Sequence, residues 1–346
     1  MGKLSFVGLG LGPRGISLEG LKEIRESDIC YVEYYTTPQE LELLSTLEKE
    51  SGKEIVVVDR EFVEDGGSIL RDSKGKKVVL AVPGDPLIAT THNELRVRAI
   101  RQGVETRVIH GATVASALAS ASGLHYYKFG RTVTVTREAQ SKPEQVYRLV
   151  HQNLLEGSHT LLLLEYDVEG REGVRPGEAV KALLDAESSF KRGVVSESTF
   201  GLVLSRIGRE GAKYEAGPFS SLSKGDYGFP PFSLVIPGEL HFTEVESIAA
   251  VFSVQQSAVH GNTEGLKRPA QTLVPKYVAK TKKALDSVRG SLGAQYGPVI
   301  ENAELYMRDA ENFLAKNDDE LAMLSIGYAE GLLDSLSFSG VAKIDW

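Results

Sequence analysis

Short apolar strands alternate with amphipathic helices along the first third of the chain, and this alternation constrains the fold more than any other feature. Strands are expected at residues 3–9, 28–35, 54–58, 76–82 and 104–110, and helices at 17–27, 38–51 and 92–103. The strand KKVVLAV at 76–82 is apolar almost throughout, which is typical of a strand that helices cover on both faces. The pattern predicts a doubly wound α/β fold, whose ligands bind at the carboxyl ends of the strands.

A second α/β region and a group of helices follow. Further strands are expected at 132–136, 159–167, 199–208 and 232–238, with helices at 142–154 and 175–189. Gly, Ser, Asn and Gln then dominate a stretch without apolar periodicity, which is the composition of a linker. Three amphipathic helices end the chain, the last with Asp318 and Asp319 as N-terminal caps. We predict α/β domains at 1–125 and 126–256, a linker at 257–271 and an all-α extension at 272–346.

The charge and cysteine content argue against several kinds of protein. The 346-residue chain has a formal net charge of -8, whereas a general nucleic-acid binder needs a concentrated basic surface to neutralise phosphates. The single cysteine, Cys30, lies in an apolar stretch, where a buried hydrophobe is more common than a nucleophile. Neither a secretory leader nor an apolar stretch of membrane-spanning length is found, so we expect a cytoplasmic protein with no membrane partner.

Three common enzyme signatures are missing from the sequence. The seven histidines are dispersed, without an HExxH pattern or a Cys/His cluster, so no metal site is expected. The GxxxxGK[ST] loop of P-loop enzymes and the GxSxG elbow of α/β-hydrolases do not occur either. A P-loop enzyme, a metalloenzyme or a hydrolase is therefore not favoured.

The glycine-rich loop GLGLGPRG at residues 8–15 follows the first strand and has the GxGxxG spacing. With Glu33 near the place of a ribose-binding acid, this spacing leaves an NAD-dependent oxidoreductase open. Pro13 weakens that interpretation, because proline lacks an amide that would face a pyrophosphate. The glycines have a second use, which is to let the backbone turn tightly and approach a ligand or the opposite domain.

The stretch VPGDPLIATTH at residues 82–92 places an acid between two prolines at the end of a strand. The prolines stiffen the loop and the glycine permits an unusual backbone, so Asp85 leaves the carboxyl end of the strand in a fixed direction. The amides of the following helix and the two threonine hydroxyls could keep this carboxylate ionised or bind a ligand carboxylate. An aspartate that only stabilises its own turn is the alternative.

Several motifs taken together resemble one superfamily of enzymes. GLGLGP, PGDP at 83–86 and ATTHNELRVRA are similar to motifs of the tetrapyrrole methylases, which transfer methyl groups from S-adenosylmethionine. GLHYYKFGRTVTV, HTLLLLEYD and PPFSLVIPGELHFTEVE narrow the resemblance to the archaeal diphthine synthases, over about residues 1–255. The resemblance implies a two-domain tetrapyrrole-methylase-like fold, usually a homodimer. It also implies methylation of the amino group of 3-carboxy-3-aminopropyl-histidine in translation elongation factor 2, a step of diphthamide biosynthesis.

The resemblance further implies which residues contact S-adenosylmethionine. Matched motif by motif, these contacts fall on Leu11, Asp85, Ile88, Thr113, Val114, Leu164, Ile207 and Phe232. Phe232 departs from the family, in which a histidine usually stands in this motif. No catalytic residue is implied, and Asp85 belongs to the cofactor pocket and not to the role of general base. The basic stretch YYKFGR at 126–131 is a candidate to border the substrate cleft.

The extension at 272–346 resembles a helical domain of unknown function found in archaea, and we assign it no chemistry. With the resemblance included, three classes of protein remain open. The first is a methyltransferase, which acts either on elongation factor 2 or on a small molecule such as a tetrapyrrole. The second is a nicotinamide-dependent oxidoreductase, and the third is a noncatalytic protein-binding module that kept the fold.

Overall fold

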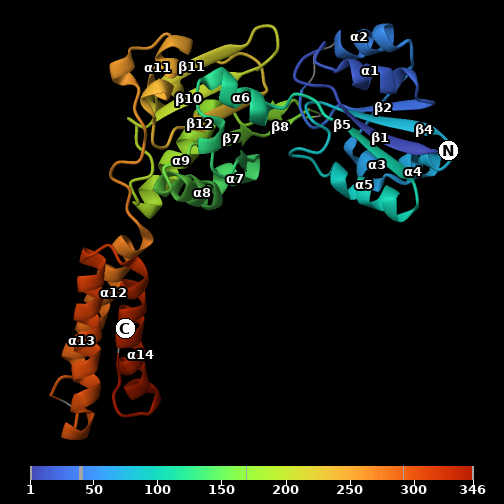
Figure 1. Ribbon diagram of the computed structural model, residues 1–346. Coiled ribbons are helices and arrows are strands. Elements are labelled where there is room, and N and C mark those ends of the chain that lie inside the picture. The colour runs from blue at the N-terminus through green and yellow to red at the C-terminus, as the bar shows by residue number, and fades with distance from the viewer. Residues whose placement is uncertain (1, 39–41, 169, 291, 345–346) are drawn as a thin grey trace. The chain divides into compact units, whose positions relative to one another are not determined.

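Figure 1 shows the computed structural model, which describes residues 2–38, 42–168, 170–290 and 292–344. The chain divides into two compact units, residues 1–264 and 265–346. The larger unit contains two five-stranded sheets with their helices, and the smaller unit consists of helices. The predicted fold class is confirmed.

The first sheet has five parallel strands. They are β1 (Lys3–Gly8), β2 (Ile29–Glu33), β3 (Ile55–Val58), β4 (Lys77–Val82) and β5 (Glu105–Ile109), in the spatial order β3-β2-β4-β1-β5. The central strand β4 is buried at every residue after its first, which accounts for its continuous apolar sequence. Because all five strands run in one direction, their carboxyl ends lie along a single edge of the sheet.

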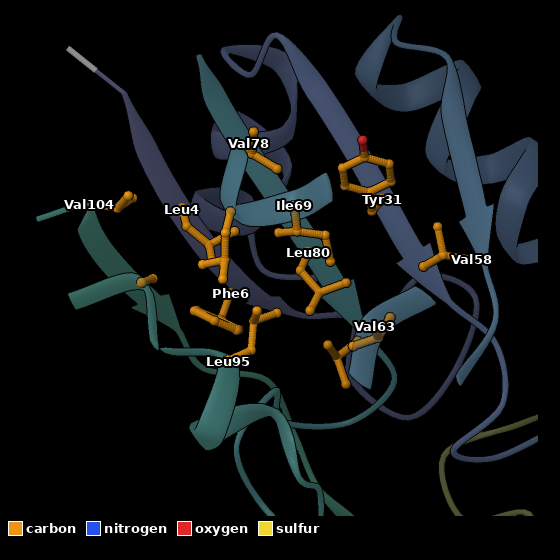
Figure 2. Close-up of a cluster of buried hydrophobic side chains, with 13 residues drawn as sticks. Leu4, Phe6, Tyr31, Val58, Val63, Ile69, Val78, Leu80, Leu95 and Val104 are labelled. Atoms are coloured by element: carbon orange, nitrogen blue, oxygen red, sulfur yellow. The ribbon is translucent and has the colours of Figure 1, made fainter. Parts of the chain in front are cut away.

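Helices cover both faces of the first sheet (Figure 1). One face carries α1 (Leu18–Arg25) and α2 (Glu42–Ser51), and the other carries α3 (Arg60–Asp65), α4 (Gly67–Ser73) and α5 (His92–Arg101). Figure 2 shows the core beneath the second group, which includes Phe6 of β1 and Leu95 of α5. The next residue of β1, Val7, packs with Ile24 in the core on the opposite face, because successive side chains of a strand alternate.

Helices α3 and α4 are not predicted from the sequence. They have only six and seven residues, too few to display a helical period of apolar side chains. Asp59 caps α3 by accepting a hydrogen bond from the Phe62 amide at 2.8 Å, and Gly66 ends the helix with a left-handed φ of 60°. These two helices carry the chain from β3 back to β4, and they place Arg60 directly beyond the end of β3.

The second sheet is mixed. Its strands are β6 (Val133–Val135), β7 (Thr160–Leu164), β10 (Phe200–Ser205), β11 (Lys213–Pro218) and β12 (Phe232–Ile236), in the order β11-β10-β12-β7-β6. The pair β6 and β7 is parallel and the other neighbouring pairs are antiparallel. The sequence does not predict β11, since this edge strand is largely exposed and lacks an apolar alternation, nor the two-stranded hairpin of β8 (Tyr166–Asp167) and β9 (Glu172–Gly173).

Most of the helices of the larger unit's second half pack near this sheet. They are α6 (Val114–Ser122), α7 (Arg137–Ser141), α8 (Glu144–Leu155), α9 (Pro176–Phe190), α10 (Phe219–Leu222) and α11 (Phe242–Val251), with 3-10 turns η1 (Tyr126–Lys128) and η2 (Gln256–Ala258). Leu118 of α6 is fully buried in one cluster with Phe200 and Leu202 of β10. Residues 114–122 therefore pack on the second sheet, although they fall within the predicted first domain, 1–125.

The smaller unit contains the three helices expected at the end of the chain. They are α12 (Pro269–Val288), α13 (Gly297–Ala315) and α14 (Asp319–Phe338), with a 3-10 turn η3 (Ala294–Tyr296). Asp318 accepts a hydrogen bond from the Leu321 amide at 3.2 Å, which confirms its predicted role as the N-cap of α14. Alanines with no exposed surface keep the helices close together, among them Ala303, Ala310, Ala322 and Ala329.

Part of the predicted linker, 257–271, is docked on the larger unit. The Asn262 side chain bonds both the amide and the carbonyl of Phe200 at 2.9 Å, and it donates to the Pro237 carbonyl at 2.8 Å. The His260 ring lies 5.4 Å from the Phe200 ring, and Val259 is buried in the neighbouring core. Composition indicates a linker here because the contacts are made by polar groups and glycines, which also favour loops.

We expect a chain that ends at residue 264 to unfold at the same denaturant concentration as the larger unit of the full protein. A chain that ends at 258 should be less stable by about 2 kcal/mol, because the three Asn262 hydrogen bonds and the buried Val259 are lost. Urea denaturation of both truncated chains, monitored by circular dichroism, makes the comparison. Equal midpoints for the two would show that residues 259–262 contribute nothing to the fold.

Candidate active site

A large cavity lies at the carboxyl edge of the first sheet and reaches residues of the second sheet. Its volume is about 690 Å³, within the range of roughly 300 to 1,000 Å³ found for small-molecule sites. All eight residues named from the sequence line it: Leu11, Asp85, Ile88, Thr113, Val114, Leu164, Ile207 and Phe232. Residues separated by more than 200 positions therefore meet at one place, as a shared ligand would require.

The two motif loops at the bottom of this cavity are hydrogen-bonded to each other. Gly10 donates to the Gly84 carbonyl at 3.1 Å, and Gly84 donates back to the Gly10 carbonyl at 2.8 Å. Both glycines have a φ of 72°, a left-handed conformation that other residues adopt only with strain. The glycine-rich loop and the PGDP loop thus form one backbone platform.

Asp85 is 4% exposed and joins three partners. Its Oδ1 accepts a bond from the Leu87 amide at 3.1 Å, which stabilises its own turn. Its Oδ2 lies 2.7 Å from His110 Nδ1 and 3.4 Å from the Gly111 amide. The expectation that the threonine hydroxyls hold this carboxylate is not met, because the Thr90 hydroxyl donates to the Pro86 carbonyl instead. Both alternatives for Asp85 hold in part, since it stabilises its turn and also lines the cavity.

The glycine-rich loop also touches the second sheet. A Cβ added to Gly12 would lie 2.7 Å from the Gly208 carbonyl oxygen, so the two backbones meet without room for a side chain. Arg209 donates through Nε to the Leu11 carbonyl at 2.5 Å and through Nη1 to the Pro38 carbonyl. The expectation that the glycines allow a close approach to the opposite domain is confirmed. Arg209 is not predicted from the sequence, because no local pattern distinguishes it from a surface arginine.

Residues after β2 and β3, which the sequence analysis does not name, line the other part of the cavity. They are Tyr35, Thr36, Thr37, Arg60 and Glu64, joined by His92 at the start of α5. The Tyr35 hydroxyl lies 3.1 Å from His92 Nε2, and His92 is 2% exposed. The signal that could have found them is topological, since residues that follow parallel strands share one edge of the sheet.

Glu33 does not take the position of a ribose-binding acid. Its side chain is fully buried, and Oε2 accepts hydrogen bonds from the Tyr35 and Thr36 amides at 3.0 Å. It fixes the turn after β2 and is not among the residues that line the cavity. This geometry argues against a nicotinamide-dependent oxidoreductase.

The basic stretch 126–131 does not line the cavity in the part of the chain that the structure describes. Lys128, which is half-buried, donates to Glu244 at 2.7 Å and to the Glu239 carbonyl. The suggestion that this stretch borders the substrate cleft receives no support, because its lysine is used inside the second half of the larger unit.

Other chemistries find no site among the described residues. No group of three or more His, Cys, Asp or Glu side chains there could hold a metal ion. Burial raises the pKa of the Cys30 thiol to about 12, so this cysteine is a buried hydrophobe and not a nucleophile. None of the described helices has the length and apolar character to cross a membrane.

The fold and the cavity define a class of enzyme that the comparisons with known proteins identify. Residues 3–218 match the family model of the tetrapyrrole (corrin/porphyrin) methylases, and the chain belongs to this family. Within it the chain groups with the diphthine synthases, which are S-adenosylmethionine-dependent methyltransferases of diphthamide biosynthesis. Residues 276–342 match a second family model, DUF357, described as a protein of unknown function.

The relatives cover the larger unit. The diphthine synthase of Methanothermobacter thermautotrophicus is 34% identical over 258 residues, which are 74% of this chain and 98% of the relative. That of Methanocella arvoryzae is 37% identical over 250 residues, 71% of this chain and 96% of the relative. A solved diphthine synthase structure is 32% identical and has a TM-score of 0.65 over 74% of this chain and 99% of that chain. The α/β part of the molecule therefore spans nearly the whole length of these relatives, which cover no more than 74% of this chain.

Proposed function

We propose that this enzyme binds S-adenosylmethionine in the cavity of the larger unit and methylates the amino group of the modified histidine of translation elongation factor 2. The observation that supports it most is the meeting of all eight residues carried over from the family at one cavity. The acceptor in this proposal is 3-carboxy-3-aminopropyl-histidine, which carries a primary amine and a carboxylate on the same carbon.

The residues of the cavity fit such a methyl donor. Asp85 offers a buried carboxylate that can accept hydrogen bonds from a ligand, and it keeps lone pairs beyond its three protein partners. Leu11, Ile88, Val114 and Ile207 line the cavity with apolar surface for flat or apolar parts of the ligand. Phe232 is 7% exposed and lines the cavity where the family usually has a histidine. A ligand contact through the backbone would be kept with this residue, whereas a contact through an imidazole would be lost.

The protein's part in the reaction is chiefly to position its two substrates. When bound, S-adenosylmethionine supplies a methyl group that its sulfonium already activates. The chain must hold the acceptor nitrogen in line with that methyl group, exclude water and remove a proton from the acceptor amine. The buried walls of the cavity serve the first two tasks.

The proposal is tested with the purified protein, labelled S-adenosylmethionine and archaeal elongation factor 2 that carries the unmethylated histidine modification. We expect label on that histidine, located by mass spectrometry of its peptide. Transfer to a tetrapyrrole but not to the factor would keep the methyltransferase and replace its substrate. Binding of NAD in place of S-adenosylmethionine would overturn the proposal altogether.

We also propose that the enzyme acts as a homodimer in the cytoplasm, with neither nucleic acid nor membrane as a partner. The homodimer rests on the family resemblance, and the net charge of -8 supports the absence of a nucleic-acid partner. Light scattering of the full chain and of residues 1–264 measures the oligomeric state with and without the helical unit. A monomer in both would contradict the dimer.

Replacing Asp85 with alanine should weaken S-adenosylmethionine binding by about 1 to 3 kcal/mol, because donors that meet this carboxylate lose a charged partner. Isothermal titration calorimetry measures the affinity, and Asp85→Asn separates the loss of charge from the loss of shape. Asp185→Ala, on the exposed side of α9, is the matched control and should bind normally. Unchanged affinity in both Asp85 variants would remove this residue from the site.

A further inference from the structure

The residues assigned to the cofactor occupy only part of the cavity's edge. In the strand order β3-β2-β4-β1-β5, the assigned residues of the first sheet follow β4, β1 and β5: Asp85, Ile88, Leu11, Thr113 and Val114. The residues that follow β2 and β3 line the same cavity but have no role in the proposed function. A methyltransferase needs a second place in its cavity, for the acceptor, and this half is available for it.

Tyr35 and His92 form a pair whose protons can be assigned from their partners. His92 Nδ1 lies 3.1 Å from the Pro86 carbonyl oxygen, which can only accept, so Nδ1 carries the proton. In a neutral imidazole Nε2 is then an acceptor, and the Tyr35 hydroxyl donates to it over 3.1 Å. The Tyr35 oxygen keeps its lone pairs to accept a hydrogen bond from a ligand in the cavity.

The surroundings keep the Tyr35 phenol uncharged before a substrate enters. Burial, with the nearby Glu33 carboxylate, raises the pKa of Tyr35 above its ordinary value of 10.0, so the phenol stays protonated and remains a donor to His92. The charged groups that act on Tyr35 come from the strand end, the following loop and α3: Glu33, Asp59, Arg60 and Glu64. Asp85 lines the same cavity. The summed charge of these groups is negative, which favours a positively charged amine at this end of the cavity.

Arg60 adds a cation at the same place. Its guanidinium carbon lies 5.3 Å from the centre of the Tyr35 ring, and the residue forms no ion pair with the part of the chain that the structure describes. An arginine stacked on an aromatic ring is held in one orientation while its donors remain open to a carboxylate. A primary amine and a carboxylate on one carbon are the two groups that Tyr35 and Arg60 together would recognise.

We propose that the half of the cavity after β2 and β3 is the acceptor subsite, in which Tyr35 is the catalytic residue that takes a proton from the acceptor amine. His92 is the positioning residue that receives the Tyr35 proton, and Arg60 binds the acceptor's carboxylate. This inference rests on the proposed function, because the amino acid group belongs to the acceptor named there.

The proton and the bonds balance over one turnover. The acceptor enters as an ammonium and gives one proton to the Tyr35 oxygen, while the Tyr35 hydroxyl proton passes to His92 Nε2. The amine lone pair then forms a bond to the methyl carbon as the carbon–sulfur bond breaks, and that bond's electron pair stays on sulfur. The products are a methylammonium and a neutral thioether, and the imidazolium returns its proton to water through Tyr35. Any further methyl group needs the same removal of one proton.

The decisive measurement is the pH dependence of kcat/KM for methyl transfer to elongation factor 2. We expect Tyr35→Phe to lower kcat/KM by on the order of 100-fold at pH 7, a usual contribution of general base catalysis. The difference in kcat/KM between the variant and the unaltered enzyme should become smaller toward pH 9.5, because a larger fraction of the acceptor amine is then already deprotonated in solution. Calorimetry should find unchanged S-adenosylmethionine affinity. Tyr34→Phe is the matched control, since the Tyr34 side chain packs in the core on one face of the sheet and Tyr35 packs on the other.

Two further variants separate the roles. His92→Gln should show the same pH-dependent deficit, and Tyr35→Phe/His92→Gln should be no worse than either single variant, because the two residues act as one relay. Arg60→Gln should raise the KM for the factor by about tenfold with a smaller change in kcat.

Each outcome bears on one claim. A deficit that stays constant from pH 7 to 9.5, or a loss of S-adenosylmethionine affinity, would reduce Tyr35 to a structural role and overturn the inference. Independent effects of Tyr35 and His92 would overturn the relay, and an unchanged KM would remove Arg60 from the subsite. If the unaltered enzyme transfers no methyl group to the factor, the proposed function itself fails, and this is seen before any variant is made.

Discussion

Replacing Glu244 with glutamine is expected to lower the free energy of unfolding of the larger unit by about 3 kcal/mol at pH 7. Glu244 lies in α11 and is fully buried, yet it is charged. Its carboxylate accepts bonds from Lys128 Nζ and the His125 amide, both at 2.7 Å, and from His159 Nε2 and the His241 amide, both at 2.9 Å. One side chain thereby ties α11 to the η1 turn and to the residue before β7.

The size of this effect follows from the carboxyl group's acidity. Burial alone would raise the pKa of Glu244, but the donors around it outweigh that penalty and bring the pKa from 4.5 to about 2. Each pKa unit corresponds to about 1.4 kcal/mol, so the ionised form gains on the order of 3 kcal/mol on folding. A neutral amide also brings two donors of its own to a place where lysine and amides already donate.

The pH dependence has a definite sign. A carboxyl group whose pKa is lower in the folded state contributes its stability above the unfolded value of 4.5, and the contribution is lost as the pH falls from 4.5 toward 2. Burial also lowers the pKa of His159 below its ordinary value of 6.5. Below pH 6.5 the unfolded chain therefore binds this proton more readily than the folded protein, which lowers the free energy of unfolding. The unaltered protein should therefore lose stability in acid, and its advantage over Glu244→Gln should shrink between pH 4.5 and 3.

Urea denaturation at pH 7, 4.5 and 3 measures these differences. Glu246→Gln is the matched control, because it changes the same residue type two positions along α11 at an exposed site. The control should stay within about 0.5 kcal/mol of the unaltered protein. Equal midpoints for Glu244→Gln and Glu246→Gln at pH 7 would show that the buried network stabilises nothing.

Most of the strands, and helices such as α1, α5 and α8, could be predicted because each carries its signal within a few residues. β4 is apolar because both faces are covered, and Ser17 caps α1, since its hydroxyl accepts a hydrogen bond from the Gly20 amide at 3.0 Å. The short helices α3 and α7 also have capping residues, but six or five residues cannot show a helical period of apolar side chains. The packing of α6 on the second sheet depends on Phe200 and Leu202, which lie about 80 residues further along the chain.

The candidate site likewise has a part that the sequence predicts and a part that it does not. The eight proposed cofactor contacts stand in motifs that a resemblance can match residue by residue, and all eight reach one cavity. Tyr35 and His92 are 57 positions apart, and nothing in either local sequence indicates that their polar atoms meet. The buried network of Glu244 is not predicted either, because the motif around this residue indicates only the family resemblance. Pairs such as these depend on tertiary structure, so a sequence taken alone cannot give them.

Replacing Gly111 with alanine should damage both the fold and the proposed cofactor site, although it adds a single methyl group. A Cβ at this position would lie 2.3 Å from the Gly84 carbonyl oxygen and 3.0 Å from both the Gly10 amide nitrogen and the Gly8 carbonyl carbon. All three neighbours are backbone atoms of the hydrogen-bonded motif loops, so none can turn aside as a side chain could. We expect the free energy of unfolding to fall by about 1 to 3 kcal/mol, the usual cost of overpacking.

The loss of cofactor affinity should exceed the loss expected from stability alone. Relief of the clash requires the Gly84 loop to move, and the next residue of that loop is Asp85, whose Oδ2 lies 3.4 Å from the Gly111 amide. Calorimetric titration with S-adenosylmethionine should show at least a tenfold weaker affinity, since about 1.4 kcal/mol corresponds to that factor. Gly75→Ala is the matched control, because a Cβ there meets no atom within 4 Å. If Gly111→Ala bound the methyl donor as tightly as Gly75→Ala, the close approach of the strand-end loops would not be what positions Asp85.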